Sequence, residues 1–597
     1  MQHIFNRKKS YVVTRPAAAT RRTPRKAALA CAALAALLGA PAAPAQTVID
    51  GNTTVTVPGD HASPWNLNAE PTAANRQLHI GVTSLASPGV SALKIVAGGQ
   101  VLDYEGYVAY GADSRGAVTV DGAGSAWRHS SSLSIGHYGD GTLSITNGAG
   151  VFSSNAMLSS GTVDVGYQSG ATGRVTVDGP GSALTLSGAL RLGVLNGSEG
   201  WLSITNGGTV SDGYFSYVGS SGVGMASVDG NGSAWTSSAD ITVGGNNKGT
   251  LTISNGGAVS NDNSMIARSA GASGSTVTVD GVNSTWTSYS TVYIGMNGGS
   301  GAMTLSNGCK ADITQGIVMG FNGGQGTLNI GAPLEGAAAA PATLDTPYAV
   351  LGEKGVGMLN FNHTDTSGTY SFNAELAGSG TVTQAAGVTV LTADSSAYYK
   401  GTVTVSGGTL DVEGSIASSS LTTVNTGATL MGAGAVGNTI IDSGGTLAPG
   451  SGAPGTSLQV QGDLTFAAGA NYAVKIDGTQ ARLADVTGTA TLDGATVQMS
   501  FATPPPALQA GDEIILMKAG AMTSPASATA VAGGYIFDLA VKNNQLIASM
   551  QAAAPVPAPA PGPDPANPVA VPTLNPATLA LLTLALAALA FWHRRRA

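Results

Sequence analysis

Four aspartates recur in the first half of the chain, and their carboxylates are the most conspicuous groups for metal chemistry. Each lies in a similar string, beginning with VTVDGAGSAW at Val118; they are Asp121, Asp178, Asp229 and Asp280. Calcium needs about six to eight oxygen ligands, and the GGxGxDxUx nonapeptide of calcium-binding repeats is absent. An aspartate before glycine is more simply a turn residue whose side chain accepts a backbone amide. We expect this role, with no metal site.

A second string between the aspartates carries a recurring asparagine before glycine. The four asparagines are Asn147, Asn206, Asn255 and Asn307. We assign them the same turn role, with stacking of their amides as an added structural contribution.

Tryptophans follow three of the four aspartates at a fixed distance and could form a sugar-stacking stripe. They are Trp127, Trp235 and Trp286, and Leu184 occupies the equivalent position of the remaining repeat. An apolar replacement favours a buried core position over a ligand platform. The tyrosines Tyr289 and Tyr293 stay open to either interpretation.

Catalytic signals are weak. Asp103 and Glu105 lie two apart, which predicts the same face of a strand, and such a pair could serve glycoside hydrolysis. A pair of this kind on a solvated strand is more often plain surface. The sequence has no GxSxG, phosphate-loop or HExxH motif, and its mature region holds scattered histidines and the lone Cys309. We therefore predict no catalytic, cofactor-binding or metal-binding residue, no cofactor, and no enzyme.

Composition points away from an ordinary enzyme and towards glycine-punctuated strands. Of 597 residues, 85 are Gly, and only 10% are charged and 5% aromatic. Basic residues are concentrated at the two ends, which leaves 15 basic against 34 acidic residues, net −19, in residues 46 to 573. Binding to nucleic acid would need a basic face, so we exclude it as a partner.

The repeated strings predict the architecture that positions these side chains. Each half-unit of about 26 residues contains alternating strands, such as Val118-Thr119-Val120, and one that ends in Ile/Val-Gly, such as Leu133 to Gly136. Three strands per turn make a coil that cannot bury its apolar face alone, whereas stacked coils share a continuous core. We predict an all-β, right-handed parallel β-helix, a solenoid of about 25 residues per coil, with about five double-coil repeats in residues 46–331.

The amino terminus has the features of a signal peptide. A basic region, Arg7 to Lys26, precedes an apolar stretch and a run of small residues, with cleavage expected between Ala45 and Gln46. A twin-arginine route is disfavoured because Pro24 and Arg25 replace apolar residues. Lipidation at Cys31 is disfavoured because the apolar region follows this cysteine rather than precedes it.

The carboxyl terminus combines a Pro/Ala-rich linker, residues 551–573, with an apolar stretch, Ala577 to Trp592, and a basic end. The stretch predicts a transmembrane helix with the arginines in the cytoplasm, and a carboxy-terminal packing helix is the alternative. The segment resembles IPTL-type sorting signals of Gram-negative bacteria, with Val in place of the leading Ile. That resemblance implies a sorting protease as a partner and residues 574–597 as its signal. The motif residues are Val571, Pro572, Thr573, Leu574, Arg594, Arg595 and Arg596.

After an Ala-rich join, residues 332–346, the repeated strings differ in sequence from those of the first half. Strings such as GAGAVGNTIIDSGGTLAPG from Gly432 resemble the passenger-associated repeats of bacterial autotransporters, which implies a surface-exposed β-helix over residues 347–550. Autotransporters end in a translocating barrel with an aromatic last residue. This sequence ends about 50 residues after its last expected strands, in Ala597, so we expect no such barrel.

These features together predict an exported protein, anchored in a membrane or displayed on the surface of a Gram-negative cell, with residues 1–45 as signal peptide. We expect an adhesin-like role or a structural role in a biofilm or matrix. Its partners would be the export machinery and a glycan or matrix ligand. A β-helical polysaccharide lyase or glycoside hydrolase is the alternative.

Overall fold

The computed structural model describes residues 47–553, apart from 71–75, 84–88, 155–160, 503–505 and 526. The expected cleavage site at Ala45 and Gln46, the sorting motif and the expected transmembrane helix all lie outside these residues. The chain divides into two units, Met1–Ala552 and Ala553–Ala597. Within the described part of the chain, no helix is long and apolar enough to cross a membrane.

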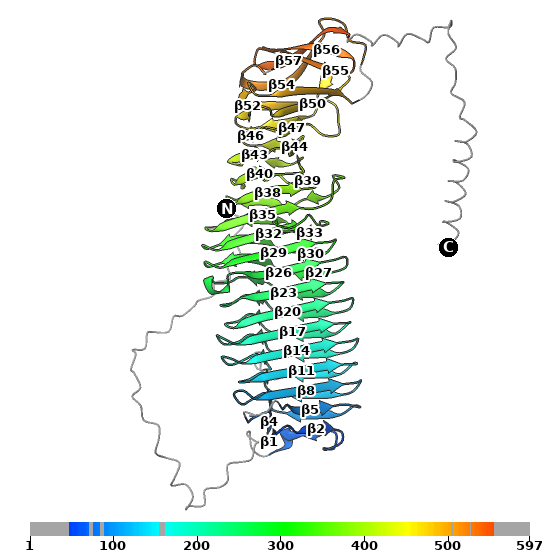
Figure 1. Ribbon diagram of the computed structural model, residues 1–597, viewed down its shortest axis with the longest axis vertical. Coiled ribbons are helices and arrows are strands. Elements are labelled where there is room, and N and C mark those ends of the chain that lie inside the picture. Colours follow the sequence, from blue (N-terminus) through cyan, green and yellow to red (C-terminus); the bar gives the residue numbers. More distant parts are fainter. Residues whose placement is uncertain are drawn as a thin grey trace, which may run out of the picture. The chain divides into compact units, whose positions relative to one another are not determined.

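The described residues form long sheets of parallel strands stacked coil upon coil (Figure 1). Along most of the chain, every strand pairs in parallel with the strand three places later, so three strands make one coil. Short 3-10 turns occur at Leu67–Ala69 and Ala270–Ala272. This confirms the predicted all-β fold with parallel strands and is consistent with a β-helix. The right-handed winding stays a prediction.

Sheet 1 forms one side of the stacked coils. It has 13 strands, and its order follows the chain with two strands skipped at each step. They are β1 (Thr47–Ile49), β4 (Gln77–Ile80), β7 (Glu105–Val108), β10 (Leu133–Ile135), β13 (Val163–Val165), β16 (Leu190–Leu192), β19 (Ser216–Val218), β22 (Ile241–Val243), β25 (Ser264–Ile266), β28 (Thr291–Met296), β31 (Gly316–Phe321), β34 (Tyr348–Leu351) and β37 (Glu375–Gly378).

Sheet 2 is the longest sheet and runs to the carboxyl end of the described chain. Its strands are β2 (Thr54–Val57), β5 (Ser91–Ile95), β8 (Arg115–Asp121), β11 (Asp140–Thr146), β14 (Thr172–Asp178), β17 (Glu199–Thr205), β20 (Val223–Asp229), β23 (Gly249–Ser254), β26 (Ser275–Asp280), β29 (Ser300–Ser306), β32 (Gln325–Gly331), β35 (Val356–Asn362), β38 (Thr381–Ala386), β40 (Thr402–Val405), β42 (Ser415–Ile416), β43 (Leu421–Val424), β45 (Ala435–Val436), β46 (Thr439–Ile441), β48 (Ser457–Val460), β49 (Leu464–Phe466), β52 (Leu483–Thr491), β54 (Glu513–Met522), β55 (Thr529–Ala532), β56 (Tyr535–Lys542) and β57 (Gln545–Ala553).

Sheet 3 completes each coil in two sections, of 11 and 8 strands. The first contains β3 (Trp65–Asn66), β6 (Gln100–Asp103), β9 (Ala126–His129), β12 (Gly150–Ser153), β15 (Ala183–Leu186), β18 (Thr209–Asp212), β21 (Ala234–Ser237), β24 (Ala258–Asn261), β27 (Thr285–Ser288), β30 (Lys310–Ile313) and β33 (Thr343–Asp345). The second contains β36 (Ser371–Phe372), β39 (Val388–Leu391), β41 (Thr409–Val412), β44 (Thr429–Gly432), β47 (Thr446–Pro449), β50 (Asn471–Asp477), β51 (Gln480–Ala481) and β53 (Thr496–Phe501).

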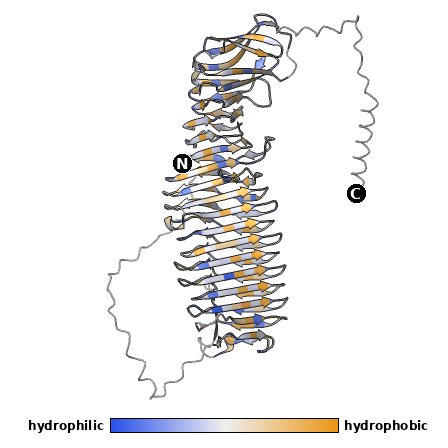
Figure 2. Ribbon diagram, viewed as in Figure 1, coloured by the Kyte–Doolittle hydropathy of each residue, from blue (hydrophilic) through white to orange (hydrophobic). Residues whose placement is uncertain are grey.

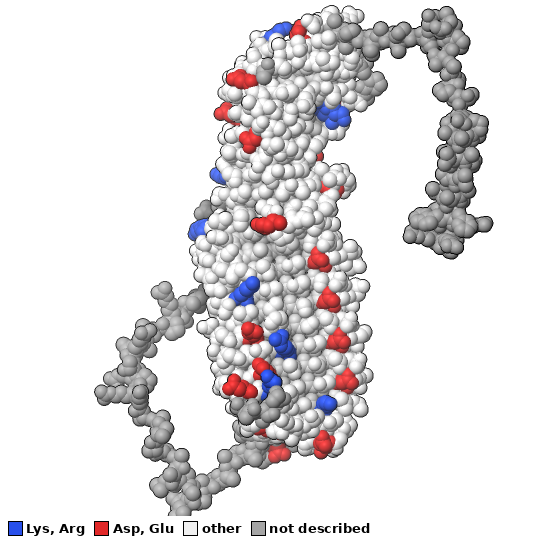
Figure 3. Space-filling model, in the orientation of Figure 1, with Lys and Arg blue, Asp and Glu red and all other residues white. Residues whose placement is uncertain are grey.

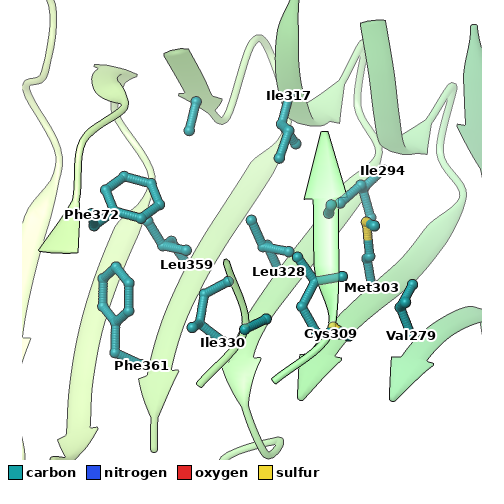
Figure 4. Close-up of a cluster of buried hydrophobic side chains, with 14 of the residues drawn as sticks. Val279, Ile294, Met303, Cys309, Ile317, Leu328, Ile330, Leu359, Phe361 and Phe372 are labelled. Atoms are coloured by element: carbon teal, nitrogen blue, oxygen red, sulfur yellow. The ribbon is translucent and has the colours of Figure 1, made fainter. Parts of the chain in front are cut away.

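Alternation of apolar and polar residues places one face of each strand in a continuous core. In β23, Leu251 and Ile253 are fully buried while Thr252 between them is partly exposed. Figure 2 shows the same alternation along the arrows of the stack. The close-up in Figure 4 shows Leu328, Leu359 and Phe361, from neighbouring coils, among the buried side chains. In β23, the alternation in the sequence therefore correctly predicts that Ile253 faces the core and Thr252 faces outward.

Glycine after the sheet 1 strand is required by the close approach of neighbouring coils. Gly136 has φ 71, a left-handed conformation, and a Cβ atom there would collide with the backbone carbonyl of Thr172 in the following coil. This explains the recurring Ile/Val-Gly ending in physical terms.

Coil length changes along the stack. Side-chain hydrogen bonds between neighbouring coils join residues 25 apart at Thr146 and Asp121, but 19 apart at Thr392 and Asn373. At Thr426 and Ser443 the separation is 17. The predicted 25 residues per coil thus fits the first half and is too long for this later region, where sheet 2 strands shrink to two residues, as in β42.

The last strands leave the parallel pattern. β54 pairs antiparallel with β57, and β55 pairs antiparallel with β56. These hairpin-like pairs end the ladder of sheet 2 at the carboxyl side of the stack (Figure 1). We call β54 to β57 the antiparallel cap.

Candidate functional site on the outer face of sheet 1

The recurring aspartates join one coil to the next. Oδ1 of Asp121 accepts hydrogen bonds from the Thr146 hydroxyl at 2.6 Å and the Asn147 side-chain amide at 2.7 Å. The other repeats place the same contacts at Asp178, Asp229 and Asp280. The prediction that these aspartates accept from a backbone amide was therefore wrong. Asp121 and Thr146 lie side by side in paired strands, so the donors nearest to the carboxylate are side chains of the following coil.

The negative charge of Asp121 and of Asp178 is stabilised by these donors. The hydrogen bonds from Thr146 and Asn147 lower the pKa of Asp121, and those from Thr205 and Asn206 lower the pKa of Asp178. The asparagines themselves have positive φ, 54 at Asn147, as their predicted turn role requires. These residues hold the stack together.

The recurring tryptophans belong to the core, as the sequence predicts. Trp127 and Trp235 are 0% exposed and Trp286 is 1% exposed. Each indole Nε1 donates to a buried acceptor of the preceding coil, which is Asp103, Asp212 or Asn261. A sugar-stacking role for these rings is excluded by their burial.

The pair Asp103 and Glu105 does not share a strand face, contrary to expectation. β6 ends at Asp103 and β7 begins at Glu105, so the chain turns a corner between them and the two residues lie in different sheets. Asp103 is 0% exposed and accepts from Trp127 and from His129 Nδ1 at 2.5 Å. Glu105 is partly exposed and accepts from Gln77 and Tyr107. Because Asp103 is sealed in the core, the pair cannot flank a substrate.

The outer face of sheet 1 differs chemically from that of sheet 2. In sheet 2 the outward central residue of successive strands is Thr or Ser, in the column Thr119, Ser144, Thr176, Ser203, Ser227, Thr252, Thr278 and Thr304. The aligned column of sheet 1 reads His79, Tyr107, Ser134, Asp164, Arg191 and Tyr217. Most inward residues of sheet 1 are Val, Ile or Leu, whereas this outward column changes in size and charge from coil to coil, and His79, Ser134 and Asp164 in it are themselves buried. This contrast marks the outer face of sheet 1 as the candidate site.

Aromatic rings from successive coils gather on this face. Tyr110 and His137 stack with centroids 5.3 Å apart, and His137 and Tyr167 stack at 4.9 Å, both at 13°. Tyr107 meets His79, Tyr110 and His137 through edge-type contacts. Burial, and secondarily the nearby His79, lowers the pKa of His137 to about 4, so its ring is neutral at pH 7.

An ion pair lies beside the rings. The Arg191 guanidinium donates two hydrogen bonds to Asp164, Nε to Oδ1 at 2.7 Å and Nη2 to Oδ2 at 2.8 Å. The side chain of Asp164 is 11% exposed and that of Arg191 is 35% exposed. Burial raises the pKa of Asp164, and the hydrogen bond and charge of Arg191 oppose this shift.

A hollow of about 340 Å³ opens between the rings and the ion pair. We call it the β7–β16 hollow; its lining includes Tyr107, Ser134, His137, Asp164, Tyr167 and Arg191. Serine and threonine hydroxyls complete the wall, among them Ser131 and Thr162. Tyr107 also donates to Glu105 at 2.9 Å, and Gln77 donates to the same carboxylate.

Other surface hollows have different linings. One of about 540 Å³ on the later part of the chain is lined by Val350, Ala377 and Tyr398, together with Lys354 and Lys400. Another, of about 350 Å³, lies on sheet 2, where Arg174 covers the Trp201 ring at 4.6 Å. Figure 3 shows a column of acidic side chains along one edge of the face in view, and further acidic and basic side chains spread over the rest of that face.

The described residues were compared with the requirements of a metal site and of a reactive thiol. They contain no group of three or more His, Cys, Asp or Glu side chains placed to hold a metal ion. Cys309 is buried, and this burial raises the pKa of its thiol to about 12, which keeps it protonated and unreactive.

Comparison with known proteins finds a motif at the carboxyl end of the chain and one segment that is similar to an adhesin. Residues 569–596 match the IPTL-CTERM motif, so the chain carries this carboxy-terminal motif at the position of the predicted sorting signal. A segment of 119 residues is 40% identical to the adhesin BmaC autotransporter of Brucella suis biovar 1 (strain 1330). That match covers 19% of this chain and only 3% of the relative. The motif and the adhesin similarity indicate an exported or surface-exposed protein.

A solved structure of a hyper-glycosylated TibA fragment, glycosylated by TibC catalysis, covers 77% of this chain and 98% of its own. The two are 13% identical with a TM-score of 0.18, which is too low to support an argument.

Proposed function

We propose that this chain is an exported β-helical protein displayed at the cell surface, where it acts as an adhesin. The similarity to the BmaC adhesin carries this proposal, and the carboxy-terminal IPTL-CTERM motif supports export and sorting. The stacked coils supply what such a protein needs, a repetitive scaffold with a continuous buried core and with outward side chains that vary along sheet 1. The adhesin role requires no catalysis.

The test is binding of the full chain to an array of glycans and extracellular-matrix proteins, with release of reducing sugars measured on the same panel. We expect binding without turnover. Sugar release would favour the alternative, a β-helical carbohydrate-active enzyme. The absence of any binding would contradict the adhesin role and leave a structural matrix role.

A further inference from the structure

The β7–β16 hollow combines donors and acceptors of hydrogen bonds at short intervals. The Thr162 hydroxyl can act as either, and the guanidinium of Arg191 donates while Asp164 accepts. The hydroxyls of Ser131 and Tyr107 donate to Glu105 and can still accept. A ligand with many hydroxyl groups satisfies such a wall, because each hydroxyl also donates and accepts. A saccharide is the ligand class with this property.

Charge in the hollow is balanced, which argues against strongly charged ligands. Asp164 is neutralised by the two hydrogen bonds from Arg191, and Glu105 already accepts from Gln77 and Tyr107. Arg191 is the one basic side chain in the lining, and it is engaged. A phosphate or sulfate would find no free cation in this lining, and the Glu105 carboxylate beside it accepts hydrogen bonds only from neutral groups, which disfavours an anion further.

The rings supply an apolar surface beside these polar groups. His137 stacks with both Tyr110 and Tyr167, so one face of each of these two tyrosines is covered by the histidine ring. Tyr107 lines the hollow, and its described ring contacts are T-shaped, with no ring stacked in parallel on it. The apolar face of a pyranose ring can pack on such a tyrosine while its hydroxyls reach the wall.

From these three observations we propose that the β7–β16 hollow binds a neutral saccharide, with Tyr107 under the sugar ring and the Asp164–Arg191 pair hydrogen-bonded to its hydroxyls. The proposal rests on the adhesin function and gives that function a location and a ligand class. The outer face of sheet 1 thereby takes the role that the buried tryptophans cannot.

The experiment measures binding of the full chain to an array that holds neutral, sialylated, sulfated and uronic-acid oligosaccharides. Two variants address the hollow: Tyr107→Ala removes the ring, and Thr162→Trp fills the space without removing Tyr107 or the ion pair. The matched control is Tyr289→Ala, because Tyr289 is 60% exposed and lies outside the hollow. Thermal unfolding of each variant reports whether its fold is kept.

We expect the wild type to bind neutral oligosaccharides, both hollow variants to lose about tenfold or more in affinity, and the control to bind like the wild type. If Tyr107→Ala unfolds, the filling variant decides alone. Glycan binding that both hollow variants retain would overturn the hollow but leave the adhesin function. Binding of acidic glycans or matrix proteins alone would likewise overturn the saccharide site in the hollow but leave the adhesin function. Failure of the wild type to bind any ligand would contradict both proposals.

Discussion

Buried carboxylates in this stack survive because the following coil supplies their donors. Asp212 is 2% exposed, and its carboxylate accepts from Trp235 Nε1 at 2.7 Å and from the Ser237 hydroxyl at 2.6 Å. Burial raises the pKa of Asp212 to about 6 despite these bonds. Trp235 is thus both a core residue and the donor that a costly buried group requires.

One repeat of the chain lacks both the tryptophan and the carboxylate of the Trp235–Asp212 pair. Where Leu184 stands in place of tryptophan, the acceptor position of the preceding coil is Ser153. We predict that Trp235→Leu destabilises the protein by about 2–4 kcal/mol, because it leaves a cavity and removes a donor from Asp212. Adding Asp212→Ser should recover about 1 kcal/mol or more of this loss, because it restores the natural combination. Denaturant unfolding of both variants measures the difference, and a double variant less stable than the single one would contradict the pairing.

A second residue-scale prediction concerns acid. The pKa of His137 falls from 6.5 to about 4 on folding, so the fold favours the neutral ring. Its contribution to stability is therefore fully present above pH 6.5 and is lost as the pH falls from 6.5 through about 4. We expect the fall in melting temperature between about pH 7 and pH 4 to be smaller in His137→Gln than in the wild type. Because Asp212 titrates with the opposite sign, the difference between the two proteins is the quantity to examine; identical falls would contradict the assigned burial.

The sequence predicted some of these residues and missed others for a physical reason. Burial of the tryptophans followed from Leu184, a local comparison between repeats. The bonds from Trp127 to Asp103 and from Arg191 to Asp164 join residues 24 and 27 apart, and only the exact coil length brings such residues together. The β7–β16 hollow was missed for this reason. Its available signal was the unusual variety of residues within the repeated segment that ends in Ile/Val-Gly.

At the scale of the strand, alternation was enough to predict which face is buried. It failed at corners: Asp103 and Glu105 are two apart, yet a turn between β6 and β7 separates them. It also could not anticipate the shorter coils beyond Ser371, because the sheet 2 strands become shorter there while the alternation within each strand is unchanged. Register within a strand is a local property, whereas coil length depends on all three corners.

Strand β23 allows a direct test of this register. We predict that Ile253→Asp costs at least about 3 kcal/mol, because Ile253 is 0% exposed and an aspartate there would be buried without a partner. The neighbouring variant Thr252→Asp should cost less than about 1 kcal/mol, since that side chain points outward. Urea unfolding of the two proteins provides the comparison. Equal midpoints would refute the register.

For the whole molecule, the IPTL-CTERM motif leads to a prediction about processing. Its residues 569–596 include an apolar stretch and three terminal arginines, which we propose hold the chain in a membrane until a protease removes the tail. With one epitope before residue 551 and another after Arg596, we expect surface fractions to contain only the first. Both epitopes together in the membrane would indicate a permanent anchor, and both in the soluble periplasm would contradict either arrangement.

The antiparallel cap has a further consequence for the behaviour of many molecules together. A parallel ladder that simply stopped would present unpaired amides and carbonyls to the next molecule, as the growing end of an amyloid fibril does. Because β57 folds back on β54, and β56 on β55, sheet 2 ends in antiparallel pairs rather than in one more parallel strand of the ladder. We expect a cap of this kind to hinder identical solenoids from polymerising end to end.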